Sequence, residues 1–275
     1  MGVLLALAAA LAYGSADFIG GLLSKRASVW TIAVVMQAAG AVGVSLVAAV
    51  GYDWPSARDL AWGAAAGIGS GAGTFFLYRG LAGGRMSVVA PLSAVGAAVL
   101  PVLIGVGTGE RPNLSAWIGV ALALPAIYLV SREPSAAPSG GGVRDGLLAG
   151  AGFGLLFVAL GQVPQEAGIW PVAFGQIVAT VILFVCSQLS RAPKPRPPSG
   201  VYAGAIAGGL LSSAANVLYQ LAVYGALVSV AAVLTSLYPA ATVALAAIVL
   251  HERVNRTQSA GLVLAAAAVV LIAQS

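Results

Sequence analysis

Charged residues are scarce in this sequence. Asp, Glu, Lys and Arg make up 8% of its 275 residues, whereas 60% are hydrophobic, and a soluble domain carries roughly 25% charged residues. This small number of charged side chains cannot cover a water-facing globule. Most of the surface must therefore face lipid. The single cysteine, Cys186, excludes an internal disulfide, and with the single histidine, His251, it excludes a zinc cluster.

Motifs for catalysis and nucleotide binding are also lacking. The single histidine lies in a predicted loop, where we find no Ser-His-Asp set to assemble around it, and no GxxxxGK[ST] sequence is present to cradle phosphates. We therefore predict no enzyme, no cofactor and no ATP-driven transport. A proton or ion gradient, exchange, or the substrate's own gradient would supply the energy. The net charge is +5, but the basic residues form no stripe, so we predict no nucleic-acid partner.

The hydrophobic residues form long runs. A spanning helix needs about 20 apolar residues, so ten would use about 200 residues. The runs are rich in Ala, Leu, Val and Gly and lack the two-residue alternation of a membrane barrel. The sequence therefore predicts an all-α integral membrane protein in a lipid bilayer, with ten transmembrane helices. Their expected positions are 2–23, 30–50, 60–80, 87–108, 114–131, 144–164, 170–189, 199–222, 228–250 and 257–273.

The two halves of the chain resemble each other. The clearest matches are Glu110-Arg111 with Glu252-Arg253 and Asn113 with Asn255 at a shift of 142, and Trp30 with Trp170 at a shift of 140. Charges are so rare here that the Glu-Arg-x-Asn match is hard to obtain by chance. Because each copy has five helices, an odd number, the two copies must enter the membrane in opposite directions. Such inverted repeats are common in secondary transporters, with the substrate near the midplane between the halves.

A Pro-, Gly- and Ser-rich interval from Arg132 to Asp145 separates the two copies, and its composition suits a flexible linker. We therefore expect a first five-helix repeat over 1–132, a linker over 133–143 and a second five-helix repeat over 144–275.

Several short segments carry a resemblance to a known family. They are Tyr78-Arg79-Gly80-Leu81-Ala82, Ser87-Val88-Val89-Ala90-Pro91-Leu92, Gly109-Glu110-Arg111-Pro112 and His251-Glu252-Arg253. The chain resembles the EamA-type branch of the drug/metabolite transporter superfamily over essentially its whole length. This resemblance implies alternating access and a small-molecule substrate, such as an amino acid or another small metabolite, often exported. We expect a multi-pass protein of the bacterial inner or plasma membrane.

Basic residues, which favour cytoplasmic loops, concentrate on one side of the predicted bundle. The side that holds the termini carries Arg58 and Arg111. The other side carries Lys25, Arg26, Arg79, Arg85, Arg132, Arg144, Arg191, Lys194, Arg196, Arg253 and Arg256. This distribution places both termini outside, whereas the resemblance implies that both are cytoplasmic. The sequence leaves the orientation open.

Asp17 is the only acidic residue well inside a predicted span. A charge at that depth costs about 2.5–3.5 kcal/mol, so a site or a partner normally justifies it. Tyr13 lies four residues earlier on the same helical face. Asp17 either contacts a substrate amine or couples a proton in a central cavity, or it is a structural acid reached by water or by Lys25 and Arg26.

Other polar side chains interrupt the apolar runs. Ser212, Asn216 and Tyr219 follow the i, i+4, i+7 spacing of one helical face. A polar stripe facing lipid is costly, so it should point inward, either to a cavity or to helix–helix hydrogen bonds worth about 0.6 kcal/mol each. The predicted substrate-binding residues are Tyr13, Asp17, Gln37, Thr74, Tyr78, Gln162, Gln176, Asn216, Tyr219, Thr235 and Tyr238. Amides, phenols and one acid favour zwitterionic or cationic ligands over polyanions.

Glu110-Arg111 and Glu252-Arg253 are expected at membrane edges, where we predict a structural role. Asn113 or Ser115 in the first copy, and Thr257 in the second, are predicted to cap the helix that follows.

Overall fold

The computed structural model describes residues 1–82, 86–131, 142–190 and 197–274. Within these ranges every regular element is a helix. They are α1 (Gly2–Ser24), α2 (Val29–Gly51), α3 (Ala57–Ala82), α4 (Met86–Gly107), α5 (Leu114–Ser131), α6 (Gly142–Gly161), the 3-10 helix η1 (Gln165–Ala167), α7 (Trp170–Leu189), α8 (Ser199–Val223), α9 (Val228–Thr235), α10 (Tyr238–Val249) and α11 (Arg256–Ala273). The prediction of an all-α protein is confirmed.

Ten spans among the described residues are long and apolar enough to cross a membrane, close to the predicted positions. The ninth consists of α9 and α10 together. The predicted span over 228–250 is therefore present, but its helix is interrupted at Ser236 and Leu237. Pro239 gives the physical reason, because it has no N–H to donate to the carbonyl one turn earlier and its ring crowds that turn.

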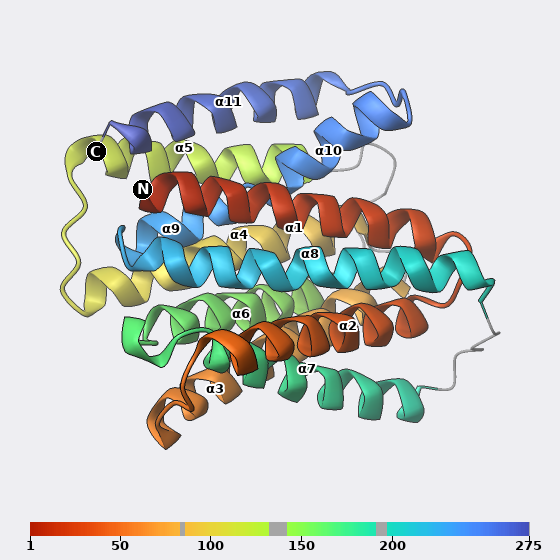
Figure 1. Cartoon of the computed structure of the whole chain (residues 1–275). Coiled ribbons are helices and arrows are strands. Elements are labelled where there is room, and N and C mark those ends of the chain that lie inside the picture. The colour runs from red at the N-terminus through yellow and green to blue at the C-terminus, as the bar shows by residue number, and fades with distance from the viewer. Residues whose placement is uncertain (83–85, 132–141, 191–196, 275) are drawn as a thin grey trace.

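Helices of the two halves pack together in a reciprocal pattern. The pairing of α3 with α6 is matched by that of α8 with α1, and the pairing of α3 with α7 by that of α8 with α2. Likewise α4 packs on α6 as α9 and α10 pack on α1. Figure 1 shows α5 and α11 side by side at one edge of the bundle and α3 and α7 at the other. This exchange of partners is the arrangement expected of two inverted repeats.

Glycines allow the crossing helices to approach closely. A side chain added at Gly209 of α8 would overlap the backbone of Met36 in α2. At the matching crossing, a side chain added at Gly67 of α3 would overlap the backbone of Gly175 in α7. Small residues at helix interfaces maximise packing in lipid, where the hydrophobic effect does not drive helices together. These two crossings therefore bring the two halves into backbone contact.

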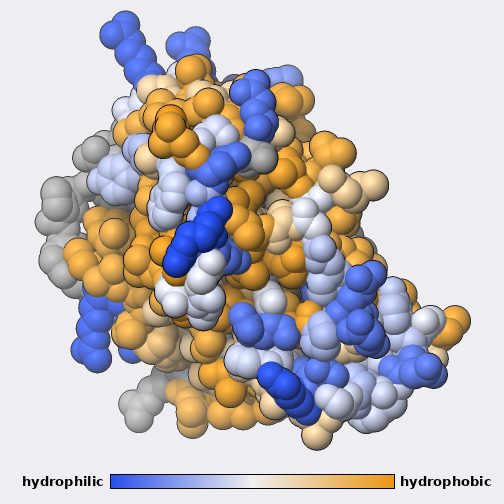
Figure 2. All heavy atoms as spheres, turned by 90° about the vertical axis from the view of Figure 1, so that its left-hand side faces the viewer, coloured by the Kyte–Doolittle hydropathy of each residue, from blue (hydrophilic) through white to orange (hydrophobic). Residues whose placement is uncertain are grey.

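Both chain termini lie at the same end of the bundle (Figure 1). We call this end the terminal face; it carries the connections at 52–56, 108–113, 162–169 and 224–227. The opposite face carries the connections at 25–28 and 250–255. Figure 2 looks onto the terminal face, where hydrophilic side chains lie among hydrophobic ones.

Two predicted boundaries differ from the structure. Helix α6 ends at Gly161 rather than at 164, so Gln162 falls in the connection to α7. Helix α6 also begins at Gly142, slightly before the predicted start of the second repeat. Residues 133–141 of the predicted linker lie outside the described residues, and the division into 1–132 and 144–275 stays a prediction.

The helix caps repeat between the two copies. The Asn113 side chain accepts a hydrogen bond of 2.9 Å from the Ala116 N–H at the start of α5. The Asn255 side chain does the same for the Gln258 N–H at the start of α11, also at 2.9 Å, and the Gln258 side chain completes a capping box. The predicted cap at Thr257 is therefore wrong, because Asn255 already occupies that role.

The Gly209→Ala variant tests the close crossing of α8 and α2. We expect it to lower the free energy of unfolding by about 1–3 kcal/mol, the usual cost of overpacking. Gly200→Ala, in the same helix but with open space around the added carbon, should leave it unchanged or slightly raised. Thermal unfolding in detergent measures both, and equal melting temperatures would contradict the crossing.

Candidate functional site

A central cavity of about 130 Å³ lies where the two halves meet. It is roughly ten times larger than the 10–15 Å³ needed to hold one water on the same measure. Residues of α1, α2, α3, α4, α6, α7, α8 and α10 line it: Tyr13, Ala16, Asp17, Ala33, Met36, Gln37, Ser70, Thr74, Leu77, Tyr78, Ala97, Phe153, Leu156, Phe157, Leu183, Ser212, Asn216 and Tyr238. A small molecule therefore fits between the repeats.

Asp17 is the acidic residue of this lining. Asp17 lies well inside the spanning helix α1, yet it is exposed. Its carboxylate therefore faces the cavity rather than packed side chains. Within the described part of the chain, no hydrogen bond or ion pair reaches that carboxylate. An acid at this depth in a membrane normally has a partner or serves a site. Asp17 is thus available to a ligand.

Phenol rings and an amide belong to the lining of the cavity. The Tyr13 hydroxyl donates a hydrogen bond of 2.7 Å to the Asn216 side-chain oxygen, joining α1 to α8. The Tyr13 ring lies 6.1 Å from that of Tyr238 and 6.2 Å from that of Phe157, centroid to centroid. The Tyr13 side chain is therefore fixed one helical turn from Asp17 by contacts from three other helices.

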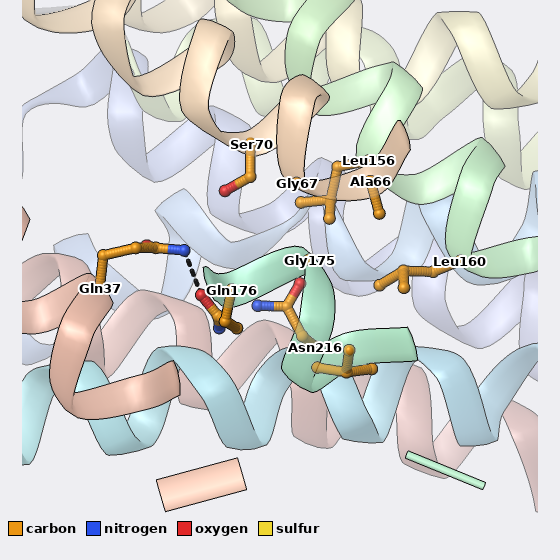
Figure 3. Close-up of a pocket in the computed structure, with 10 residues that line it drawn as sticks. Gln37, Ala66, Gly67, Ser70, Leu156, Leu160, Gly175, Gln176 and Asn216 are labelled. Atoms are coloured by element: carbon orange, nitrogen blue, oxygen red, sulfur yellow. Dashed lines mark hydrogen bonds between the residues drawn. The ribbon is translucent and has the colours of Figure 1, made fainter. Parts of the chain in front are cut away.

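A second, much smaller cavity of about 10 Å³ adjoins the first, and the two linings share Gln37, Ser70, Leu156 and Asn216. Figure 3 shows Gln37 of α2 and Gln176 of α7 pointing toward each other beside it, and the Gln37 amide donates a hydrogen bond to the Gln176 side-chain oxygen. These glutamines come from different repeats, so the amide pair bridges the two halves.

Aromatic and polar contacts join the elements at the terminal face. The rings of Trp54 and Trp170 lie 4.7 Å apart, and the Trp170 indole N–H donates a 3.2 Å hydrogen bond to the Tyr52 carbonyl. The Gln220 side chain donates to the Gly168 carbonyl at 2.6 Å. These contacts tie the connections of the terminal face to α7 and α8.

An ion pair ties the two halves together toward the opposite face. The Arg79 guanidinium at the end of α3 contacts the buried Asp145 carboxylate at the start of α6, and it also lies 4.7 Å from the centre of the Phe76 ring. Tyr78 is its neighbour on α3 and lines the cavity. Its ring lies 6.3 Å from that of Trp30.

The structure brings most of the predicted site residues together. The lining of the large cavity includes Tyr13, Asp17, Gln37, Thr74, Tyr78, Asn216 and Tyr238, and that of the small cavity includes Gln176.

Three predicted site residues lie elsewhere. Gln162 is exposed beyond the end of α6. Tyr219 is fully buried and donates a 2.9 Å hydrogen bond to the Phe157 carbonyl, so it stands behind the lining. Thr235 is fully buried against the Ala6 carbonyl of α1. None of them lines either cavity, because helical spacing predicts the face of a helix but not how deep the cavity extends along it.

Some lining residues were not predicted. Ser70, Phe153 and Phe157 belong to the lining, but in the sequence they do not differ from packing residues. Phe157 is aromatic, as cavity-lining residues often are, but its position in the sequence does not distinguish it from the aromatic residues of the core. Among the described residues, no group of three or more His, Cys, Asp or Glu side chains is placed to hold a metal ion.

Comparisons with known proteins agree with this architecture. The model of the EamA-like transporter family matches residues 1–132 and 142–274. Among solved structures, 22 chains match. One crystal structure superimposes with a TM-score of 0.74 over 98% of this chain and 95% of the other, at 18% identity, which shows the shared fold alone. No match was found among curated proteins. Since the family model covers nearly the entire sequence in two successive halves, this chain belongs to the EamA-like transporter family, whose members are small-molecule transporters of the drug/metabolite transporter superfamily.

Proposed function

We propose that this protein exports a small amine-bearing metabolite, such as an amino acid or a related cation, by alternating access between its two repeats. The bacterial inner or plasma membrane is its proposed location. The observation that carries this proposal is the Asp17 carboxylate, which faces a cavity between the repeats and has no partner among the described residues.

The chemistry of the lining supports an ammonium group as the part of the substrate that is recognised. A carboxylate forms a charge-assisted hydrogen bond with an ammonium. Tyr13, Phe157 and Tyr238 line the same cavity, and the faces of aromatic rings attract cations through their quadrupoles. No Lys or Arg is among the described residues that line the cavities, so the site offers nothing to neutralise a polyanion.

The remaining lining residues suit a short polar substrate. Asn216, Gln37 and Thr74 can both donate and accept hydrogen bonds, as the carboxylate or side chain of a zwitterion requires. The cavity of about 130 Å³ is below the range of roughly 300–1,000 Å³ typical of drug-sized ligands. Uptake or exchange of a cationic, drug-like compound is the second candidate, and the aromatic rings beside Asp17 favour it.

A flux screen in proteoliposomes tests the substrate class. We expect amino acids or small monoamines to be transported faster than organic dianions, with a dependence on an imposed pH gradient if protons are coupled. Faster flux of large aromatic cations would favour the second candidate. Absence of flux for all three classes would contradict transport and favour a structural or signalling role.

The Asp17→Asn variant tests the carboxylate itself. Asparagine keeps the size of the side chain but loses the charge that pairs with an ammonium, so we expect at least a tenfold loss of amine flux, since a hydrogen bond to a charged group is worth about 1.5–3 kcal/mol. Asp53→Asn, on an exposed residue of the terminal face, is the matched control and should retain normal flux. Wild-type flux in a well-folded Asp17→Asn protein would remove Asp17 from the site.

A further inference from the structure

The Glu110 carboxylate joins the first repeat to the second at the terminal face. It accepts hydrogen bonds from the backbone N–H groups of Val228, at 2.7 Å, and Ser229, at 3.1 Å. These are the first residues of α9. N–H groups in the first turn of a helix have no partner within the helix, and the positive end of the helix dipole favours an anion there. Glu110 is therefore a cap supplied to α9 by the other half of the chain.

The second repeat holds the same device in sequence and in backbone. Glu252 follows α10 as Glu110 follows α4, and the two positions are related by the shift of 142. The residue before each is in the left-handed region, with φ +107° at Gly109 and +55° at His251. Met86, at the start of α4, is the residue that the same shift pairs with Val228.

The two copies of this device differ in their contacts. Glu110 is engaged, whereas Glu252 is exposed, and no hydrogen bond or ion pair reaches its carboxylate within the described residues. The Glu110 N–H bonds the Gly105 carbonyl at 2.8 Å, but the Glu252 N–H bonds the Ala246 carbonyl at 3.3 Å. The backbone hydrogen bond that closes the turn is thus shorter in the first copy than in the second.

A second pair of equivalent residues differs in the same direction. At the terminal face, a carbon added to Gly161 at the end of α6 would lie 2.9 Å from the Val228 side chain, so α9 starts in contact with α6. The shift of 140 pairs Gly161 with Gly21 at the end of α1. Among the side chains that the structure describes, a carbon added at Gly21 would meet nothing within 4 Å. Both differences place closer contacts at the start of α9 than the described residues make at the equivalent position of the opposite face.

We infer that Glu110 and Glu252 are alternating caps of the transport cycle. In the state described here, Glu110 caps α9 and holds the terminal face closed. In the other state, Glu252 caps the first turn of α4, the opposite face closes, and Glu110 releases α9. The inference rests on the alternating access proposed above and assigns the interaction that holds each closed state. Inverted repeats give the physical reason, because one sequence motif occupies equivalent positions at both faces and only one face closes at a time.

Hydrogen exchange measured by mass spectrometry on the full-length protein in nanodiscs, without substrate, tests the alternation. Glu110→Gln keeps the shape of the side chain but turns one acceptor into a donor against an N–H group. We expect peptides from the start of α9 to exchange about tenfold faster, the effect of losing a hydrogen bond to a charged acceptor. We also expect peptides from the start of α4 to exchange more slowly, because the population moves to the state that closes the opposite face.

Glu252→Gln should produce the reverse pattern, with slower exchange at the start of α9 and faster exchange at the start of α4. This variant changes an exposed side chain, so it keeps the test available if Glu110→Gln folds poorly. Glu166→Gln, which removes another exposed glutamate from the terminal face, is the matched control and should change neither segment.

The reciprocal response separates alternating caps from a simple structural cap. Faster exchange at α9 with no change at α4 would show that Glu110 is only a local cap and would overturn the inference, as would shifts of the same sign in the two glutamine variants. Because exchange is measured without substrate, reciprocal shifts would stand even if no compound were transported. Conversely, normal amine flux together with unchanged exchange would refute the caps and leave the proposed function intact.

Discussion

Where α8 crosses α2 and α3 crosses α7, glycines let the backbones of the two halves touch directly. Lipid provides no hydrophobic drive for helices to associate, so their packing depends on close approach. Both crossings join one repeat to the other, and the most extensive contacts of α1 and α6 also reach the opposite half. Neither half could form its contacts alone, and the central cavity exists only because the halves interlock.

The same solvent determines where the polar side chains lie. A polar group facing hydrocarbon has no water to bond, so these groups either pair across helices or face an internal space. Tyr13 with Asn216, and Gln37 with Gln176, follow the first course while also bordering the cavities. Asp17 follows the second. Structural pairing and the proposed ligand contact therefore share one region of the bundle.

Inverted symmetry makes small differences between the repeats informative. The two copies share their helix partners and their asparagine caps, at Asn113 and Asn255. They differ at Glu110 and Glu252, and at Gly161 and Gly21. Each pair has the same residue at equivalent positions of the two repeats but different contacts, and this difference is the basis of the proposed alternating caps.

Much of the architecture could be predicted from the sequence. Hydrophobic runs of spanning length fixed the ten helices, because an apolar solvent demands that length of any helix that crosses it. The Glu-Arg-x-Asn repeat showed the duplication, and the odd number of helices made it inverted. The interruption between α9 and α10 was harder to predict, because Pro91 and Pro101 lie inside an unbroken α4 while Pro239 follows a break.

The sequence by itself determined that the chain spans a membrane, that its halves are inverted, and that an acid at position 17 needs a partner or a site. Only the tertiary structure decided which polar residues meet. Tyr219 shares a helical face with Asn216 yet lies behind Phe157, and Gln162 falls beyond the end of its helix. Periodicity specifies a direction around a helix axis, whereas the position of a cavity along that axis depends on how the other helices cross it.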